Sequence, residues 1–171
     1  MYKRSIIAAS IALILDQITK YWVIYEIKLP ALFLGGKPML ESGGHVIEVT
    51  SFFNLVMVWN CGISFGIFNE GECSEGQAWA LIALTSAIVV AMIFWLRKIE
   101  IKTEAIAVGL IIGGALGNIL DRIIYGAVAD FLDFYIGNYH WPAFNIADSC
   151  VFIGVFILVM VSFLNNNKKH E

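Results

Sequence analysis

The stretch "FNIADSCVFIGVFILVM" (residues 144–160) decides the fold, because it is a long apolar run that begins with an acidic residue. A helix that crosses the hydrocarbon core of a bilayer needs about 20 mostly apolar residues. Asp148 lies near the start of this run, shortly after Asn145. An ionisable side chain at membrane depth costs free energy, so its presence needs an explanation. Two questions follow: how often the chain crosses a membrane, and what Asp148 does there.

Composition and segment lengths answer the first question. Of the 171 residues, 59% are hydrophobic and 15% are charged, whereas a soluble domain is about half apolar and about a quarter charged. The chain is therefore predicted to be a membrane protein. Lys3 and Arg4 precede the first apolar segment, as in a cleaved signal peptide, but no small-residue cleavage site follows, so we expect a retained helix. The four segments long enough to span a bilayer are residues 5–25, 78–96, 105–124 and 146–164.

A fifth apolar segment, "VTSFFNLVMVW" (residues 49–59), is too short for a span and rich in β-branched and aromatic residues, which favours a strand. Four spans place most basic residues on one side of the membrane, where the positive-inside rule locates the cytoplasm. A fifth span would move "RKIEIK" to the outside. Both termini are therefore expected in the cytoplasm. The basic residues on that side are Lys3, Arg4, Arg97, Lys98, Lys102, Lys168 and Lys169, whereas Lys28 and Lys37 lie opposite.

These observations predict the fold class. We expect an all-α membrane protein, a four-transmembrane-helix bundle that forms a single domain over residues 1–171. The insert at about residues 26–77 contains the predicted strand and many turn-forming residues. It is expected to form a small extracytoplasmic β-element on the membrane surface, with aromatic side chains in the interface.

The third helix, "GLIIGGALGNILDR", contains a stripe of small residues followed by a polar turn. A stripe of this kind lets another helix approach closely. Asn118, Asp121 and Arg122 follow on one turn, and two interpretations stay open for them. They form a polar cluster that faces the bundle, or Arg122 extends to lipid headgroups. The small residues are Gly109, Gly113 and Gly117.

The first helix contains Asp16 and Lys20, which are four residues apart and so lie on one face. One interpretation is an ion pair that neutralises itself inside the bundle. The other is that one or both side chains contact a bound ligand directly.

Asp148 also has two interpretations. After Pro142, the spacing of Asn145 and Asp148 resembles a capping box, with Asp148 stabilising the start of the fourth helix. Alternatively, Asp148 acts together with Asp130 or Asp133, which follow the third helix on the same side of the membrane. Two carboxylates at close range share a proton. One can then activate water while the other protonates a leaving amine. Spacing alone does not choose between Asp130 and Asp133.

The cysteines and histidines do not suggest a metal site or a cofactor. Cys61, Cys73 and Cys150 are odd in number and lack the spacing of zinc ligands. We therefore predict neither a disulfide nor a metal role for them, although Cys61 and Cys73 are both placed on the extracytoplasmic side. The three histidines are scattered along the chain, at His45, His140 and His170.

Five motifs together resemble a known family. In chain order they are "DQITK" (16–20), "NCGISFG" (60–66), "GGALGNILDR" (113–122), "GAVADFLDF" (126–134) and "FNIADS" (144–149). They resemble the motif blocks of the bacterial lipoprotein signal peptidases (type II signal peptidases), and the resemblance covers residues 16 to 150. These are membrane aspartyl proteases. They remove the signal peptide from a diacylglyceryl-modified prolipoprotein by cleaving before the lipidated cysteine.

The resemblance implies a role for each matching position. It makes Asp130 and Asp148 the catalytic pair, and thereby separates Asp130 from Asp133. The chain departs from the family pattern at Ile63 and Ser64, where smaller residues are common in the family. It also has "VAD" where "VVD" or "VID" is commoner. The positions implied to bind or orient the substrate and the pair are Asn60, Gly62, Asn118, Arg122 and Asn145, and the structural polar positions are Asp16, Lys20 and Asp121.

The resemblance also implies partners and a location. The expected partners are the prolipoprotein substrate, membrane lipids and globomycin-type inhibitors, with no nucleic acid and no cofactor. The protein is expected to act as a monomer in the bacterial inner membrane, with its active site near the outer leaflet. Two other functions are weighed against this one. A small transporter would place its polar site near the midplane between repeats, and a non-catalytic assembly factor would tolerate isosteric changes at the aspartates.

Overall fold

Four long helices dominate the computed structural model, which describes residues 1–27, 32–33, 46–62 and 75–167. Within these residues, four helices are long and apolar enough to cross a membrane. They match the four predicted spans, so the predicted helix bundle is confirmed. The helices are α1 (Tyr2–Tyr21), α2 (Glu75–Leu96), α3 (Lys102–Tyr125) and α4 (Ile146–Asn167), and a π-helical turn η1 (Trp22–Ile27) extends α1. The predicted features at His45, Ile63, Ser64, Cys73 and His170, and much of the insert, lie outside the described residues.

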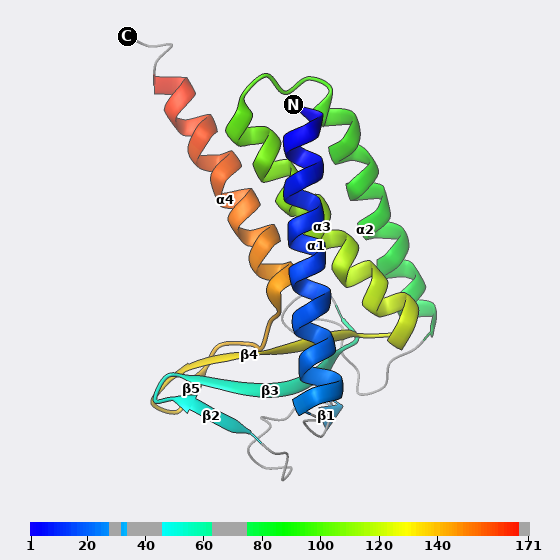
Figure 1. The fold of residues 1–171 in the computed structure, drawn as a ribbon, viewed down its shortest axis with the longest axis vertical. Helices are drawn as coiled ribbons and strands as arrows, with labels where there is room; N and C mark the ends of the chain where they lie inside the picture. Colours follow the sequence, from blue (N-terminus) through cyan, green and yellow to red (C-terminus); the bar gives the residue numbers. More distant parts are fainter. Residues whose placement is uncertain (28–31, 34–45, 63–74, 168–171) are drawn as a thin grey trace. The chain divides into compact units, whose positions relative to one another are not determined.

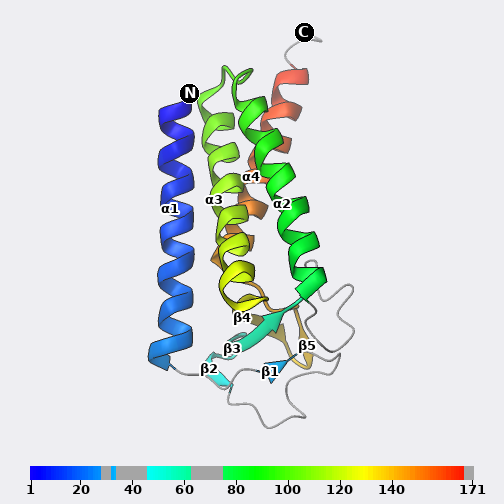
Figure 2. The same cartoon turned by 90° about the vertical axis from the view of Figure 1, so that its right-hand side faces the viewer.

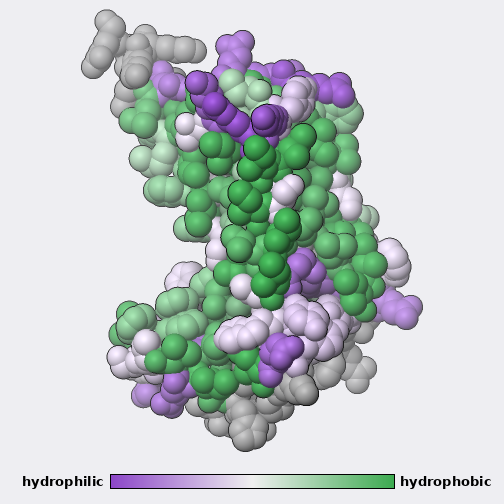
Figure 3. Space-filling model, in the orientation of Figure 1, coloured by the Kyte–Doolittle hydropathy of each residue, from purple (hydrophilic) through white to green (hydrophobic). Residues whose placement is uncertain are grey.

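The chain divides into two compact units. The helical unit consists of Met1–Asp16, Thr85–Gly117 and Ile146–Glu171. The sheet unit consists of Gln17–Leu84 and Asn118–Asn145. Large apolar side chains remain exposed along the helices, as expected for surfaces that face lipid rather than water (Figure 3).

In the helical unit, α3 packs closely against α1 and α4 (Figure 2). A Cβ atom added at Gly109 would collide with the carbonyl oxygen of Ser5 on α1. One added at Gly114 would collide with the carbonyl oxygen of Ala147 on α4. Gly109 and Gly113 of the small-residue stripe therefore bring the backbones of α3 and α1 into direct contact, as the spacing predicts, whereas Gly114, which approaches α4, lies outside the stripe.

The sheet unit contains a five-stranded sheet in which β3 and β4 are the central strands (Figure 1). β1 pairs with β3 in parallel, and the other pairings are antiparallel. The predicted strand is confirmed, but confining the β-element to the insert was wrong. β4 and β5 come from the segment between α3 and α4, whose "VADFLDFYI" is rich in β-branched and aromatic residues. The strands are β1 (Leu32–Phe33), β2 (Ile47–Thr50), β3 (Phe53–Asn60), β4 (Val128–Ile136) and β5 (Tyr139–His140).

The pairing of β3 with β4 changes register partway along. Leu55 lies opposite Leu132, but Val58 lies opposite Asp130, so β3 contains one extra residue between these pairs. This is a β-bulge, which reverses the faces of the following side chains relative to a regular strand.

Substituting Gly113 with alanine is expected to destabilise the helical unit. The new Cβ would lie 2.8 Å from the Cβ of Ala12 and would collide with the carbonyl oxygen of Ala9. Overpacking of this kind costs about 1–3 kcal/mol. The thermal unfolding midpoint in detergent should fall accordingly.

Gly76→Ala is the matched control, because no atom lies within 4 Å of the added Cβ. Its midpoint should stay the same or rise, since alanine favours a helix more than glycine does. Equal midpoints for the two variants would contradict close packing at Gly113.

Candidate active site

Asp130 is a buried carboxylate held by two asparagine amides. Its side chain lies on β4 and the residue is only 1% exposed. Asn60 Nδ2 donates to Oδ2 at 3.0 Å, and Asn145 Nδ2 donates to Oδ1 at 2.7 Å. A buried carboxylate needs such donors, because an unpaired charge in a low-dielectric interior is costly. Both oxygens are thus satisfied while the carboxylate is fixed in one orientation.

Asn60 is aimed at Asp130 by two local features. The β3 bulge places Asn60 opposite Val128, so that its side chain lies on the same face of the sheet as that of Asp130. Asn60 Oδ1 also accepts a hydrogen bond from the Gly62 backbone N–H at 3.0 Å, which is an Asx turn. With its oxygen used in this way, the amide nitrogen is directed at the carboxylate.

Asn145 is positioned by the residue before it. Phe144 pairs with Leu132 of β4 through hydrogen bonds in both directions, of 2.9 and 3.1 Å. This bridge brings Asn145 beside Asp130, where Asn145 Nδ2 also lies 3.2 Å from Asn118 Oδ1. Because α4 begins at Ile146, Asn145 occupies the predicted N-cap position.

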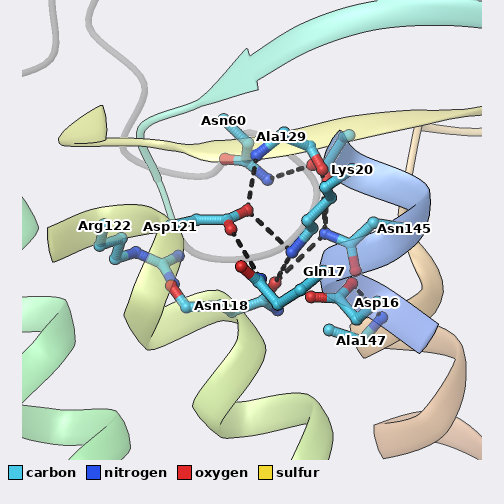
Figure 4. Close-up of polar contacts among 11 residues, drawn as sticks. Asp16, Gln17, Lys20, Asn60, Asn118, Asp121, Arg122, Ala129, Asn145 and Ala147 are labelled. Carbon is cyan, nitrogen blue, oxygen red and sulfur yellow. Dashed lines mark hydrogen bonds and ion pairs between the residues drawn. The ribbon is translucent and has the colours of Figure 1, made fainter. Parts of the chain in front are cut away.

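A buried ion pair between Lys20 and Asp121 adjoins Asn118, and so extends the hydrogen-bond network of Asn145 (Figure 4). Lys20 Nζ lies 2.8 Å from Asp121 Oδ2 and donates to Asn118 Oδ1 at 3.1 Å. Asp121 also accepts hydrogen bonds from Gln17 Nε2 at 3.2 Å and from the Ala129 backbone N–H at 3.1 Å. The bond to Ala129 fixes the start of β4 directly beside Asp130. Gln17 was missed in the sequence, although it lies between Asp16 and Lys20 in "DQITK".

Arg122 contacts backbone carbonyl groups of the same unit. Its Nη2 donates to the Gly62 carbonyl at 3.1 Å, and its Nη1 donates to the Asn118 carbonyl at 3.2 Å. These contacts support the polar-cluster interpretation over extension to lipid headgroups. They also link the end of α3 to the residues that orient Asn60.

Asp16 stabilises the start of α4 in the helical unit. It is 0% exposed and its Oδ1 accepts a hydrogen bond from the Ala147 backbone N–H at 2.9 Å. An added Cβ at Gly117 would collide with its other oxygen, so this glycine makes room for the carboxylate. An anion at a helix N-terminus satisfies an N–H group that the helix cannot. Whether Asp16 also pairs with Lys20 stays a prediction.

The two predicted catalytic aspartates belong to different units. Asp148 lies in the first turn of α4 in the helical unit, next to Ala147, and is partly exposed. Asp130 belongs to the sheet unit. Their closeness to each other stays a prediction. Asp133, the alternative that spacing left open, is instead bonded to Asn54 Nδ2 at 3.0 Å and to His140 Nδ1 at 2.9 Å.

The prediction about the cysteines needs a correction. Cys61 is in a disulfide, and Cys150 is free. Odd number and spacing argued against zinc ligands, but they carry no information on whether two of three cysteines meet in space. Cys61 lies between Asn60 and Gly62, beside the site. Within the described ranges, no three His, Cys, Asp or Glu side chains form a group that could hold a metal ion.

The site and the four spans together define a polytopic membrane protein with a buried, hydrogen-bonded aspartate. A family model described as signal peptidase (SPase) II matches residues 8–164. A lipoprotein signal peptidase of Sphingopyxis alaskensis is 41% identical over 95% of this chain and 87% of its own length. One of Alteromonas mediterranea is 40% identical over 95% of this chain and 82% of its own length.

Solved structures agree with these relatives. Two chains described as bacterial membrane enzyme structures, obtained by the in meso method, superpose with TM-scores of 0.78 and 0.69. They are 30% and 31% identical to this chain, and cover 96% and 92% of it and 90% of their own length.

The protein is therefore a membrane-embedded peptidase. The chain belongs to the signal peptidase II family. It is an aspartic endopeptidase that removes signal peptides from prolipoproteins, and a multi-pass protein of the bacterial inner membrane.

Replacing Lys20 with methionine is expected to destabilise the sheet unit strongly. The substitution leaves the Asp121 carboxylate, whose side chain is 1% exposed, without its ammonium partner. Breaking a buried ion pair from one side costs about 3–5 kcal/mol. Thermal unfolding in detergent measures the loss.

The double variant Lys20→Met with Asp121→Asn should be more stable than Lys20→Met alone. A neutral amide oxygen at position 121 still accepts hydrogen bonds, but no buried charge is left uncompensated. A double variant that is no more stable than the single variant would contradict the ion pair.

Proposed function

We propose that Asp130 and Asp148 form the catalytic pair of this peptidase. The observation that carries the proposal is the fixed, buried carboxylate of Asp130, whose two oxygens accept hydrogen bonds from Asn60 and Asn145. Asp148 follows Ala147, whose N–H is bonded to Asp16, so the backbone beside the second carboxylate is also held. Each aspartate thus lies on a segment fixed by buried polar contacts, as a preorganised site requires.

The mechanism follows from the chemistry of two neighbouring carboxyl groups. When two carboxylates share a site, one retains a proton that the other has lost. The ionised group takes a proton from a water molecule as the water attacks the scissile carbonyl carbon. The protonated group then gives its proton to the leaving amine as the C–N bond breaks. The pair ends with one proton again, and no covalent enzyme intermediate forms.

The neighbouring polar groups orient the reactants. Asn60 and Asn145 each donate an amide hydrogen bond to Asp130, and these two bonds fix the orientation of the carboxylate. Asn118 Oδ1 accepts hydrogen bonds from both the Lys20 ammonium and the Asn145 amide, and so helps to hold Asn145 in place. Gly62 and Arg122 also help to orient Asn60. The Arg122 side chain donates to the Gly62 backbone carbonyl, which links the turn formed by Asn60 and Gly62 to α3.

The substrate is a diacylglyceryl-modified prolipoprotein, cleaved before its lipidated cysteine. Its signal peptide is itself an apolar helix with two acyl chains nearby, so membrane lipids surround it until it reaches the enzyme. A site near the outer leaflet receives such a substrate directly from the bilayer. Globomycin-type cyclic depsipeptides bind at the same site. The protein acts as a monomer, and its two units work as one peptidase domain.

Both termini lie in the cytoplasm. In the helical unit, the start of α1, the 97–101 connection and the C-terminal end of α4 lie at one end (Figure 1). Lys3, Arg4, Arg97 and Lys98 belong to these segments. The positive-inside rule makes that end cytoplasmic.

Asp130→Asn and Asp148→Asn are each expected to abolish cleavage, because an amide can neither accept nor supply the proton. The assay follows processing of a diacylglyceryl-modified prolipoprotein by the purified protein in lipid, by gel mobility. A globomycin-type depsipeptide should block processing by the wild-type protein. Near wild-type turnover by either variant would disprove the assignment.

Asp133→Asn is the matched control on the same strand. The amide oxygen can still accept hydrogen bonds from Asn54 and His140, so the variant should keep activity within about tenfold of wild type. Complete loss of cleavage by this variant, with a normal unfolding midpoint, would make Asp133 a candidate for the reacting pair.

A further inference from the structure

A second asparagine–aspartate pair lies on the other side of the β3 bulge from the first. Asn54 lies opposite Asp133, and its Nδ2 donates to Asp133 Oδ2 at 3.0 Å. Both residues are buried, at 4% and 7% exposure. The catalytic site therefore has a near copy, in which the same two strands contribute the same two residue types.

His140 completes this second cluster from β5. Its Nδ1 lies 2.9 and 3.0 Å from the two carboxylate oxygens of Asp133, so Nδ1 carries the proton and donates. The imidazole stacks on Tyr135, with ring centroids 4.9 Å apart and planes 13° apart. The cluster of Asn54, Asp133 and His140 thus joins β3, β4 and β5.

Near the Asn60–Asp130 pair, the apolar pattern of β3 and β4 does not determine their register. Val56, Met57 and Val58 are consecutive in β3, and each is 2% exposed. On β4, Val128 to Phe131 are likewise all buried. A strand buried on both faces loses little hydrophobic burial when it slips by one residue, although every side chain then changes face. Polar pairs must therefore decide which register is adopted.

A slip of β4 against β3 by one residue would disrupt both polar pairs together. Asn54 would face away from Asp133 and leave a buried carboxylate short of a donor, which is costly. Asn60 would at the same time face away from Asp130, because side chains alternate along a strand. The cost of losing the second pair thus opposes the same slip that would disorder the first.

We propose that Asn54, Asp133 and His140 form a register lock that keeps Asn60 aimed at Asp130. Asp133 and Asn54 are then positioning residues, which act on cleavage only through the Asn60–Asp130 contact. This inference rests on the proposed catalytic role of Asp130.

Asn54→Asp tests the lock, because it sets two carboxylates against each other and favours a slipped register. Misplacement of a catalytic group lowers turnover by about 10- to 100-fold. We expect kcat for prolipoprotein cleavage to fall by that factor, with KM nearly unchanged. Combining Asn54→Asp with Asp133→Asn exchanges amide and carboxylate, and should restore kcat to that of Asp133→Asn. Failure of this exchange to recover kcat would overturn the lock.

A double-mutant cycle with Asn60→Ala separates positioning from general stability. If Asn54 acts through Asn60, Asn54→Asp should not lower kcat further once Asn60 is removed. A merely structural role would lower the folded fraction, and hence the rate, by the same factor in both backgrounds. Such additive losses would overturn the proposal. Asn54→Leu removes the donor at similar size and serves the same cycle if the aspartate variant does not fold.

Thr50→Val is the matched control. It removes the hydrogen bond from the Phe52 N–H to Thr50 Oγ1, at 3.4 Å in the same sheet, without touching the β3–β4 pairing. Its kcat should equal that of the wild type. If Asp130→Asn retains cleavage, the catalytic assignment fails whatever the cycle shows. If Asp130→Asn is inactive but the cycle is additive, only the register lock fails.

Discussion

The hydrogen bonds from two asparagine amides to the buried carboxylate of Asp130 are the constraint on which the sheet unit depends. A carboxylate that is 1% exposed is tolerable only with donors in place. Supplying those donors requires the bulge in β3, the Asx turn at Gly62 and the bridge between Leu132 and Phe144. Segments that are far apart in the sequence, those of Asn60 and Asn145, are thereby brought together at Asp130. The same contacts that stabilise the buried carboxylate also fix its orientation, as its proposed catalytic role requires.

The ion pair between Lys20 and Asp121 extends this order into the helices. An isolated charge in a membrane helix is costly, so Lys20 and Asp121 must neutralise one another. Lys20 also donates a hydrogen bond to Asn118, and Asp121 accepts one from the Ala129 backbone N–H beside Asp130. Asp16 does in the helical unit what Asp121 does in the sheet unit, because its carboxylate accepts a hydrogen bond from a backbone N–H, that of Ala147. Buried polar groups thus serve stability and positioning together.

Composition and segment length were enough to predict the four helices, because bilayer thickness dictates long apolar runs. The residue pattern also located β3, but not β4, because two carboxylates interrupt the β-branched and aromatic residues of its sequence "VADFLDFYI". Register shifts such as the bulge, and a disulfide at Cys61, depend on contacts between distant segments that a single sequence does not display. The choice of Asp130 over Asp133 came from family resemblance. In the structure each aspartate accepts hydrogen bonds from side chains, Asp130 from Asn60 and Asn145 and Asp133 from Asn54 and His140, so the choice of Asp130 stays a prediction.

An experimental structure of the protein with a bound globomycin-type depsipeptide would show whether Asp130 and Asp148 form a pair. The quantity to measure is the distance between the nearest carboxyl oxygens of Asp130 and Asp148. We predict that these oxygens contact each other or one shared water, at about 2.6–3.2 Å, while Asn60 and Asn145 still bind Asp130. Carboxyl groups too far apart for a single water to bridge would contradict it.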